Sequence, residues 1–235
     1  MKLWNWAAAA AVLLAAGSVQ AGTVASWSFE DPTIPPADAT FVDEGLVSGP
    51  MSLEMGGGLK SAIEKGWKAP GLATFHWDQS TLADARDAGD YLTFSIAPQT
   101  TLNLSSLSIE GWLGSDVSIT LQLFAKRADE TEYSAVSDAV TAANGDKSFQ
   151  AVLSILGMES ESQAIDFQLA GINSDADPYV GFGPSGEQSL LLTGQAAQAE
   201  TPPAVVPVPA AVWAGGLVLG LLGVGSTVRR WFVTT

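Results

Sequence analysis

The amino-acid sequence predicts an all-β fold, an antiparallel β-sandwich of the jelly-roll type. Three observations lead to this prediction. Segments in which apolar and polar residues alternate recur through residues 22–194, as in strands with one buried face. Gly, Pro, Asn and Asp, which favour turns, separate these segments. One short stretch alone has the pattern of a helix, which is typical of sandwiches and barrels.

The first expected strand covers residues 24–29, where apolar and small side chains alternate. A short helix is expected over 80–88, because Ser80 and Thr81 can cap its start and Gly89 can end it. The next strand, 91–96, alternates cleanly and is followed by Pro98, which cannot donate to a β-ladder.

The second half of this region contains the remaining expected strands. Residues 102–109 form a β run with a predicted bulge at Ser105-Ser106, and 117–124 shows the strongest period-two alternation of the chain. An Asn144-Gly145 turn then precedes four further strands. These strands are 147–155, 164–169, 179–182 and 189–193.

Charge and composition exclude several classes of function. The chain has 25 acidic and 10 basic residues, a net charge of −15. Without the two terminal segments, seven basic residues remain and the net charge is near −18. Such a surface argues against binding nucleic acid or anionic membranes. Since the chain has no cysteine, disulfides, thiolate metal sites and cysteine nucleophiles are also excluded.

The N-terminal residues 1–21 have the features of a signal peptide. Lys2 gives a positive start, residues 7–16 form a short apolar core, and Val19-Gln20-Ala21 fits a small-x-small cleavage site. Cleavage between Ala21 and Gly22 would start the mature chain at Gly22. The expected domain then covers residues 22–194, and a Pro- and Ala-rich linker covers 195–205.

The C-terminal segment, 206–235, contains an uncharged stretch at 210–228. These 19 residues would form a helix of roughly 28 Å, close to the thickness of a bilayer core. Arg229 and Arg230 follow the stretch, so the positive-inside rule places the C-terminus in the cytoplasm. The physics alone allows two interpretations, a permanent single-span anchor or a sorting signal that is later removed.

The order of residues in this tail favours the second interpretation. A Val-Pro-x-Pro-Ala motif, a nearby aromatic residue, the apolar span and terminal arginines resemble the PEP-CTERM class of bacterial sorting signals, closest to its VPLPA-CTERM form. The matching residues are Val206, Pro207, Pro209, Ala210, Trp213, Arg229 and Arg230. The resemblance implies a Gram-negative bacterium, an inner-membrane intermediate, and an exosortase that cleaves near the proline motif and passes the protein to the cell surface or extracellular matrix.

The region between the two termini is similar to other surface proteins that carry such a tail. The shared motifs are Trp27-Ser-Phe29, Gly66-Trp67, the run from Ala83 to Phe94, the run from Leu104 to Ser108, and the run from Leu190 to Gly194. The resemblance implies a β-sandwich similar to carbohydrate-binding modules, and that group has no settled biochemical role.

Aromatic residues are the first candidates for a binding site. Trp67, Trp77, Trp112 and Tyr133 could stack on the apolar face of a sugar ring. Trp67 and Trp77 are favoured among them because Gly and Pro flank their loops, whereas Trp27 and Trp112 lie in or beside apolar strands and are expected in the core. The alternative is that all of these aromatic residues pack in the core or anchor loops.

Carboxylates near two loops are candidates for a structural Ca²⁺ site. Asn173, Asp175 and Asp177 alternate before Pro178, and oxygen ligands at this spacing can converge on one cation. By analogy with sandwich lectins, Glu30 or Asp31 could complete the site. The alternatives are a polar turn and a solvated strand end.

No arrangement of residues indicates catalysis. His76 is the only histidine, and no Gly-x-Ser-x-Gly elbow accompanies it. We therefore expect a non-enzymatic, exosortase-sorted surface or matrix protein associated with exopolysaccharide. The first alternative is a lectin similar to carbohydrate-binding modules with structural calcium. The second is a secreted glycan hydrolase, for which the sequence selects no particular pair of carboxylates.

Overall fold

A computed structural model of the protein describes residues 21–29, 35–61, 71–113, 118–143, 148–173, 180–183 and 189–197. The chain divides into two compact units, Met1–Ala197 and Gln198–Thr235. The second unit, with the expected membrane helix 210–228, lies outside the described residues, as do signal-peptide residues 1–20. In the ranges that are described, no helix has both the length and the apolar character to span a bilayer.

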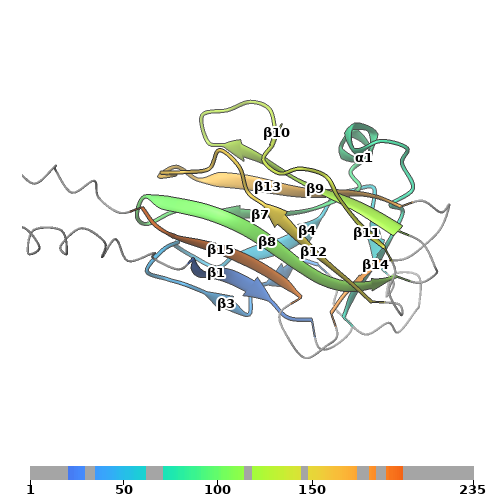
Figure 1. Ribbon diagram of the computed structural model, residues 1–235, viewed down its shortest axis with the longest axis horizontal. Coiled ribbons are helices and arrows are strands. Elements are labelled where there is room, and N and C mark those ends of the chain that lie inside the picture. Colours follow the sequence, from blue (N-terminus) through green and yellow to red (C-terminus); the bar gives the residue numbers. More distant parts are fainter. Residues whose placement is uncertain are drawn as a thin grey trace, which may run out of the picture. The chain divides into compact units, whose positions relative to one another are not determined.

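The described strands form two antiparallel sheets that enclose one apolar core (Figure 1). The first sheet has the order β3 (Phe41–Val42), β1 (Gly22–Trp27), β15 (Leu190–Ala196), β8 (Leu102–Leu113), β14 (Val180–Phe182), β6 (Leu72–Phe75) and β5 (Lys60–Ser61), with β12 (Ser148–Ser154) also paired to β8. The second sheet has the order β10 (Ser134–Ala135), β9 (Ser118–Arg127), β13 (Ile165–Asn173), β7 (Tyr91–Ile96), β4 (Ser52–Met55) and β2 (Ala37–Asp38), with β11 (Val140–Ala143) also paired to β9.

Aromatic side chains join the two sheets at the centre of the core. Trp27, from the first sheet, lies 5.1 Å from Phe94 of the second, measured between ring centroids. Phe94 in turn stacks on Phe167 of the neighbouring strand at 5.0 Å. All three side chains are buried, and burial of large aromatic surfaces is a major source of stability in such cores. The predicted β-sandwich is therefore confirmed.

The strands with long alternating patterns lie where the sequence predicts them. The strand expected at 91–96 is β7, and the region expected at 117–124 is β9, in which Ile119, Leu121 and Leu123 are buried. The predicted bulge is also present, since Thr193 pairs with Ser106 and Gly194 with Leu104, which leaves Ser105 without an opposite residue.

Several boundaries differ from the prediction. Strand β1 begins and ends two residues earlier than expected, β9 continues from 124 to Arg127, and β13 continues from 169 to Asn173. Strand β8 continues from 109 to Leu113, and β15 continues two residues into the expected linker, where Gln195 pairs with Asn103. The backbone N–H of Ala197 then donates to the carbonyl of Thr101, so the ladder extends this edge beyond Gly194. The apolar alternation ends before these residues, and backbone pairing alone continues the strand.

Helix α1 (Leu82–Ala88) begins and ends as predicted. The Thr81 hydroxyl accepts a hydrogen bond from the Asp84 N–H at 3.1 Å, which caps the first turn. Gly89 ends the helix with φ of 88°, a conformation that favours glycine. The helix packs against β13 through its buried residue Ala85, and this contact brings Arg86 to the second sheet.

Candidate functional site

The outer face of the second sheet carries polar and aromatic side chains in cross-strand rows. Residues of β9, β13 and β7 that alternate with the buried core residues point to this face. One row is Lys126, Asp166 and Ser95, and the next is Phe124, Gln168 and Thr93. Side chains directly opposite one another in such a ladder lie close enough to interact.

The three side chains of the first row interact with one another. The Lys126 ammonium lies 3.5 Å from the Asp166 carboxylate, and the Ser95 hydroxyl donates to the same carboxylate at 2.6 Å. The row therefore offers donors and an acceptor side by side. Because Lys126 and Asp166 keep 28% and 42% of their side-chain surface exposed, a ligand can reach both.

Tyr133 lies beside this row, in the connection between β9 and β10. The Lys126 Nζ is 5.0 Å from the centroid of its ring, and the Arg86 Cζ is 5.8 Å from it. The pKa of the Tyr133 phenol is raised, first by burial and then by the nearby Asp166, so the phenol stays neutral at neutral pH. Tyr133 as a whole residue is half-buried, and Lys126 and Arg86 lie over its ring.

Arg86 completes the arrangement from helix α1. Its guanidinium lies 4.5 Å above the ring of Phe124, which is 7% exposed under this cover. Among the described residues, no carboxylate forms an ion pair with Arg86, and its buried Nε has no hydrogen-bond partner. We call Arg86, Phe124, Lys126, Tyr133 and Asp166 the Tyr133 cluster.

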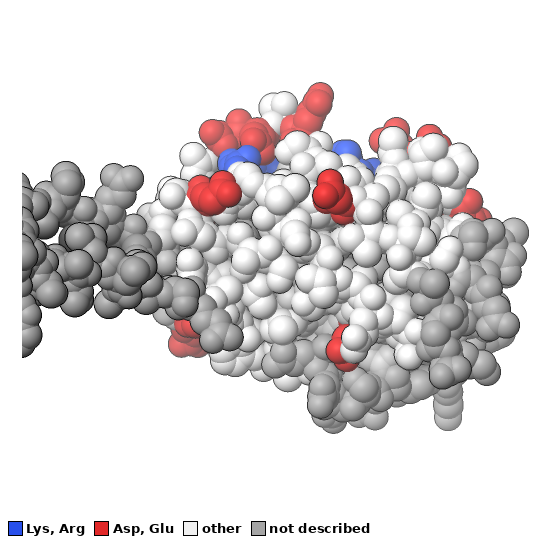
Figure 2. All heavy atoms as spheres, viewed as in Figure 1, with Lys and Arg blue, Asp and Glu red and all other residues white. Residues whose placement is uncertain are grey.

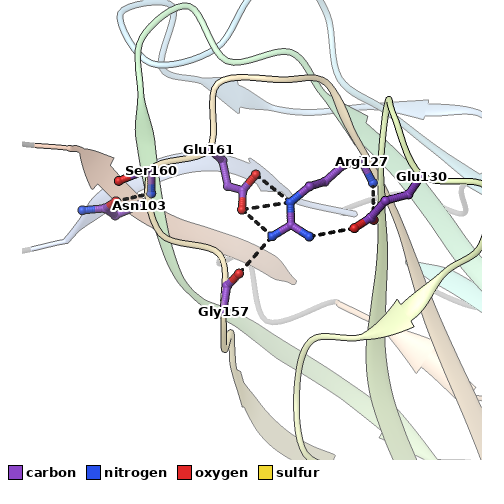
Figure 3. Close-up of polar contacts among 6 residues, drawn as sticks. All are labelled: Asn103, Arg127, Glu130, Gly157, Ser160 and Glu161. Atoms are coloured by element: carbon purple, nitrogen blue, oxygen red, sulfur yellow. Dashed lines mark hydrogen bonds and ion pairs between the residues drawn. The ribbon is translucent and has the colours of Figure 1, made fainter.

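The turn that leads to Tyr133 is held by Arg127 (Figure 3). The Arg127 guanidinium donates to the Glu161 carboxylate from Nε at 3.0 Å and from Nη2 at 2.6 Å, and from Nη1 to Glu130 at 3.1 Å. The backbone N–H of Arg127 also donates to the Glu130 carboxylate at 2.9 Å. These hydrogen bonds raise the pKa of Arg127, chiefly through Glu161, and lower the pKa of Glu130.

The same ion pair fixes the connection between β12 and β13. Glu161 exchanges two backbone hydrogen bonds of 2.8 Å with Leu102, and the Ser160 N–H donates to the Asn103 side-chain oxygen at 2.7 Å (Figure 3). Arg127 Nη2 also donates to the Gly157 carbonyl at 2.9 Å. Arg127 thus holds two loops to the end of β9, and its role is structural.

The structure corrects the prediction that Trp77 is a sugar-stacking residue. Its side chain is completely buried, and its Nε1 donates to the Thr74 hydroxyl at 2.9 Å. The ring lies against Gly171, where an added Cβ would come within 2.6 Å of the Trp77 ring. The backbone around Trp77 is irregular, as predicted, but the side chain points into the core. The other favoured candidate, Trp67, lies outside the described residues.

Trp27 and Trp112 were both expected in the core, but they lie on opposite sides of the first sheet, so the prediction is wrong for Trp112. Trp27 is completely buried, as expected. The Trp112 ring is half-buried and lies against Gly181, where an added Cβ would overlap it at 2.0 Å. Trp112 therefore covers the outer side of β14 instead of filling the core.

The predicted calcium ligands are placed only in part. Asn173 ends β13, is 8% exposed, and donates its backbone N–H to the Trp77 carbonyl at 2.6 Å. Glu30, Asp31, Asp175 and Asp177 lie outside the described residues, as do the sorting-signal residues. Over the ranges that the structure describes, no group of three or more His, Asp or Glu side chains is arranged to hold a metal ion.

Sequence reasoning named Tyr133 but missed Arg86, Phe124, Lys126 and Asp166. Phe124 ends the strand expected at 117–124, and Lys126 lies beyond it, in the part of β9 that the sequence did not predict. Arg86 could not be found from a strand pattern, because it reaches the sheet through the packing of helix α1. In Figure 2 the basic side chains lie at the upper margin of the molecule, where Figure 1 shows β9, β10 and β13, and most of the face in view is uncharged.

Comparisons with known proteins give distant similarities. No protein-family model matches the chain, and no curated protein matches it. A mutant of the family 29 carbohydrate-binding module CBM29-2 has 9% identity and a TM-score of 0.35, covering 79% of this chain and 99% of the module. A CBM61 module in complex with β-1,4-galactotriose has 10% identity and a TM-score of 0.29, covering 60% and 80%. The Eiger TNF protein of S. frugiperda has 18% identity and a TM-score of 0.28, covering 46% and 68%. These values are too low to assign a fold family or a ligand.

Proposed function

We propose that the protein is an exported, non-enzymatic component of the cell surface or extracellular matrix, whose jelly-roll-like sandwich binds exopolysaccharide at the Tyr133 cluster. The observation that carries the proposal is the half-buried residue Tyr133 beside a row of partly exposed donors and acceptors. A sugar ring has an apolar C–H face and a rim of hydroxyls, so it needs this combination of an aromatic surface and adjacent polar groups.

The polar row suits hydroxyl groups, which both donate and accept. Lys126 and Ser95 can donate, and the Asp166 carboxylate can accept. The backbone carrying these groups is a paired strand surface, which holds them in fixed positions and reduces the entropy lost on binding. Rigid placement favours selective binding of a flexible polymer.

The number of carboxylates in the Tyr133 cluster fits binding without hydrolysis. Glycoside hydrolysis requires two carboxylates on either side of the scissile bond, one of them protonated. Asp166 is the single carboxylate of the Tyr133 cluster, and it is paired with Lys126. This arrangement supports a binding role over the alternative of a secreted glycan hydrolase.

Export by a cleaved signal peptide and an exosortase-type signal is the second part of the proposal. Strand β1 begins at Gly22, directly after the expected cleavage site, and β15 ends at Ala196, before the segment 206–235. Removal of both terminal segments would therefore leave every described strand of the sandwich complete. The acidic chain without cysteine is also consistent with this destination.

A glycan array followed by affinity electrophoresis tests the binding site. Tyr133→Ala should abolish retention by the glycan, and Tyr133→Phe should keep most of it because the ring remains. Val152→Ala is the matched control, since Val152 is 57% exposed on β12 of the other sheet. Failure of the wild-type protein to bind any glycan would contradict the proposed function.

Mass spectrometry of surface material tests the sorting route. The expected N-terminus is Gly22, and the expected C-terminus lies near the proline motif, without Arg229 and Arg230. Recovery of an intact tail from the cell surface would instead support a permanent single-span anchor. This measurement is independent of whether the sandwich binds a glycan.

A further inference from the structure

We propose that the glycan bound at the Tyr133 cluster carries carboxylate groups, as in a polysaccharide of uronic acids, and that Arg86 recognises a carboxylate. The inference rests on the proposed function and adds the chemical class of the ligand. It follows from which of the described basic side chains form ion pairs with carboxylates of the protein.

The described part of the chain has few cations, and two of them face this cluster. Lys126 is paired with Asp166, and outside the cluster Arg127 is paired with Glu161 and Glu130. Arg86 differs from these two, since none of the described carboxylates forms an ion pair with it. Lys60, the fourth described cation, likewise has no ion pair with a described carboxylate, but it is exposed in β5 of the first sheet, away from the cluster. In a chain with 25 acidic and 10 basic residues, a cation left without a carboxylate on a binding face points to an anionic ligand.

The orientation of Arg86 suits a carboxylate. Its guanidinium is stacked 4.5 Å above the ring of Phe124, so Phe124 covers one face of the guanidinium. Stacking leaves the N–H groups in the plane of the guanidinium, and these are the donors that form paired hydrogen bonds to a carboxylate. The Nε of Arg86 is buried without a hydrogen-bond partner, so the Nη atoms of this half-buried residue are the donors that would meet a ligand.

The nearby ring explains why the anion would belong to a sugar. Tyr133 lies 5.8 Å from the Arg86 Cζ, a distance at which a sugar ring against Tyr133 can direct a substituent toward Arg86. Lys126 lies on the same ring at 5.0 Å and can donate to hydroxyls of that sugar. The aromatic surface, the hydroxyl partners and the carboxylate partner thus lie within one sugar unit.

Exposed acidic residues lie close to members of the cluster in the sequence. Asp87, Asp129 and Glu132 are exposed near Arg86 or Tyr133 in the sequence, and they would repel a polyanion from a distance. Overall charge therefore does not recruit such a ligand, and recognition must come from local contacts. We expect selection of a carboxylate placed on a ring, and weak binding of polyanions in general.

The experiment compares ligands that differ only in charge. The full-length protein is tested at constant ionic strength against polygalacturonate and alginate, each beside its methyl-esterified form, with dextran sulfate as a general polyanion. The wild-type protein should bind at least one free-acid polymer roughly tenfold more tightly than its ester, as expected for a charge-assisted pair. Dextran sulfate should bind more weakly than that polymer.

Variants separate Arg86 from the rest of the site. Arg86→Gln should lower affinity for the free acid about tenfold and leave affinity for the ester unchanged, while Arg86→Lys should give an intermediate value. Tyr133→Ala should lower affinity for both forms. Thermal unfolding of each variant, with Val152→Ala as the control, confirms that the sandwich is folded.

The possible failures are distinguishable. Equal affinity for the free acid and the ester would overturn this inference and leave glycan binding at Tyr133 intact. An Arg86→Gln variant that keeps its full affinity for both forms would have the same consequence. Equally tight binding of dextran sulfate would show a general anion site, which also overturns it. If the protein binds neutral glycans and no free-acid polymer, the inference is also overturned. If no glycan of any kind binds, the proposed function itself is wrong.

Discussion

Replacing Arg127 by methionine would test the structural role of the ion pair at the end of β9. Methionine keeps much of the length of the side chain but removes the guanidinium donors to Glu161, whose side chain is 8% exposed. Removing one partner of a buried ion pair generally costs about 3–5 kcal/mol, because a charge stays buried without compensation. The Arg127 side chain is 28% exposed, so water can reach Glu161 and we expect the lower end, about 3 kcal/mol.

Two further variants locate the source of this loss. Glu130→Gln removes the charge of the more exposed partner of Arg127, whose side chain is 36% exposed. This variant should reduce stability much less than Arg127→Met does. Arg127→Met combined with Glu161→Met removes the buried charge together with its partner. The double variant should regain much of the stability lost in Arg127→Met, because apolar side chains can replace a buried pair at little cost.

Urea and thermal unfolding measure these differences. For a domain of this size, 1 kcal/mol corresponds to roughly 2–4 °C, so Arg127→Met should lower Tm by roughly 6–12 °C. The reasoning would be refuted if Arg127→Met and Glu130→Gln were equally stable. It would also be refuted if the double variant were no more stable than the single one, since the buried charge would then not be the cause.

Three further predictions concern the core, a buried carboxylate and calcium. Trp77→Ala should lower the free energy of unfolding by about 3–5 kcal/mol through the cavity that it leaves, and denaturant unfolding would show this loss. Burial raises the pKa of the Asp90 carboxyl, and Asp78 raises it further. The stabilising contribution of Asp90 is therefore complete below the pKa that this carboxyl has in the unfolded chain, and it is lost as pH rises through the pKa of the folded protein. Asp90→Asn should therefore raise Tm at pH 7 and leave it unchanged at pH 3; an equal effect at both values would contradict this. If the loop of Asn173, Asp175 and Asp177 binds calcium, EDTA should lower the calorimetric midpoint and added Ca²⁺ restore it, whereas an unchanged midpoint removes the metal.

The extent to which the fold follows from the sequence depends on the length of each element. Strand β7 and helix α1 were predicted closely, because six alternating residues and two caps are strong local signals. Strands β2, β3, β5 and β10 were not predicted, since each has two residues and cannot show a period of two. Strands β4, β6 and β11 were also missed, because four residues give only a weak alternation. Such strands form because longer neighbours offer a free edge.

The candidate site follows from the sequence only where one strand defines it. Phe124 lies in the strand expected at 117–124 and Tyr133 was among the aromatic candidates, whereas Lys126 lies beyond that expected strand. Trp77 was misplaced because Gly and Pro flank its loop, whereas its ring packs against Gly171, far away in the chain. Contacts of this kind are set by tertiary packing, which local patterns do not record.

Arg127 and Trp77 should separate the stability of the sandwich from its binding of glycan. Arg127 holds the turn that begins with Glu130 and leads to Tyr133, so its loss frees the segment carrying the ring as well as destabilising the fold. Trp77→Phe weakens the core by removing the hydrogen bond to Thr74, but it leaves the outer face of the second sheet untouched. Compared at a temperature where both variants are folded, Arg127→Met should therefore bind glycan more weakly than the wild-type protein, and Trp77→Phe should bind it equally well. Equal affinities in the two variants would mean that the turn does not position Tyr133, and the role of Arg127 would then be limited to stability.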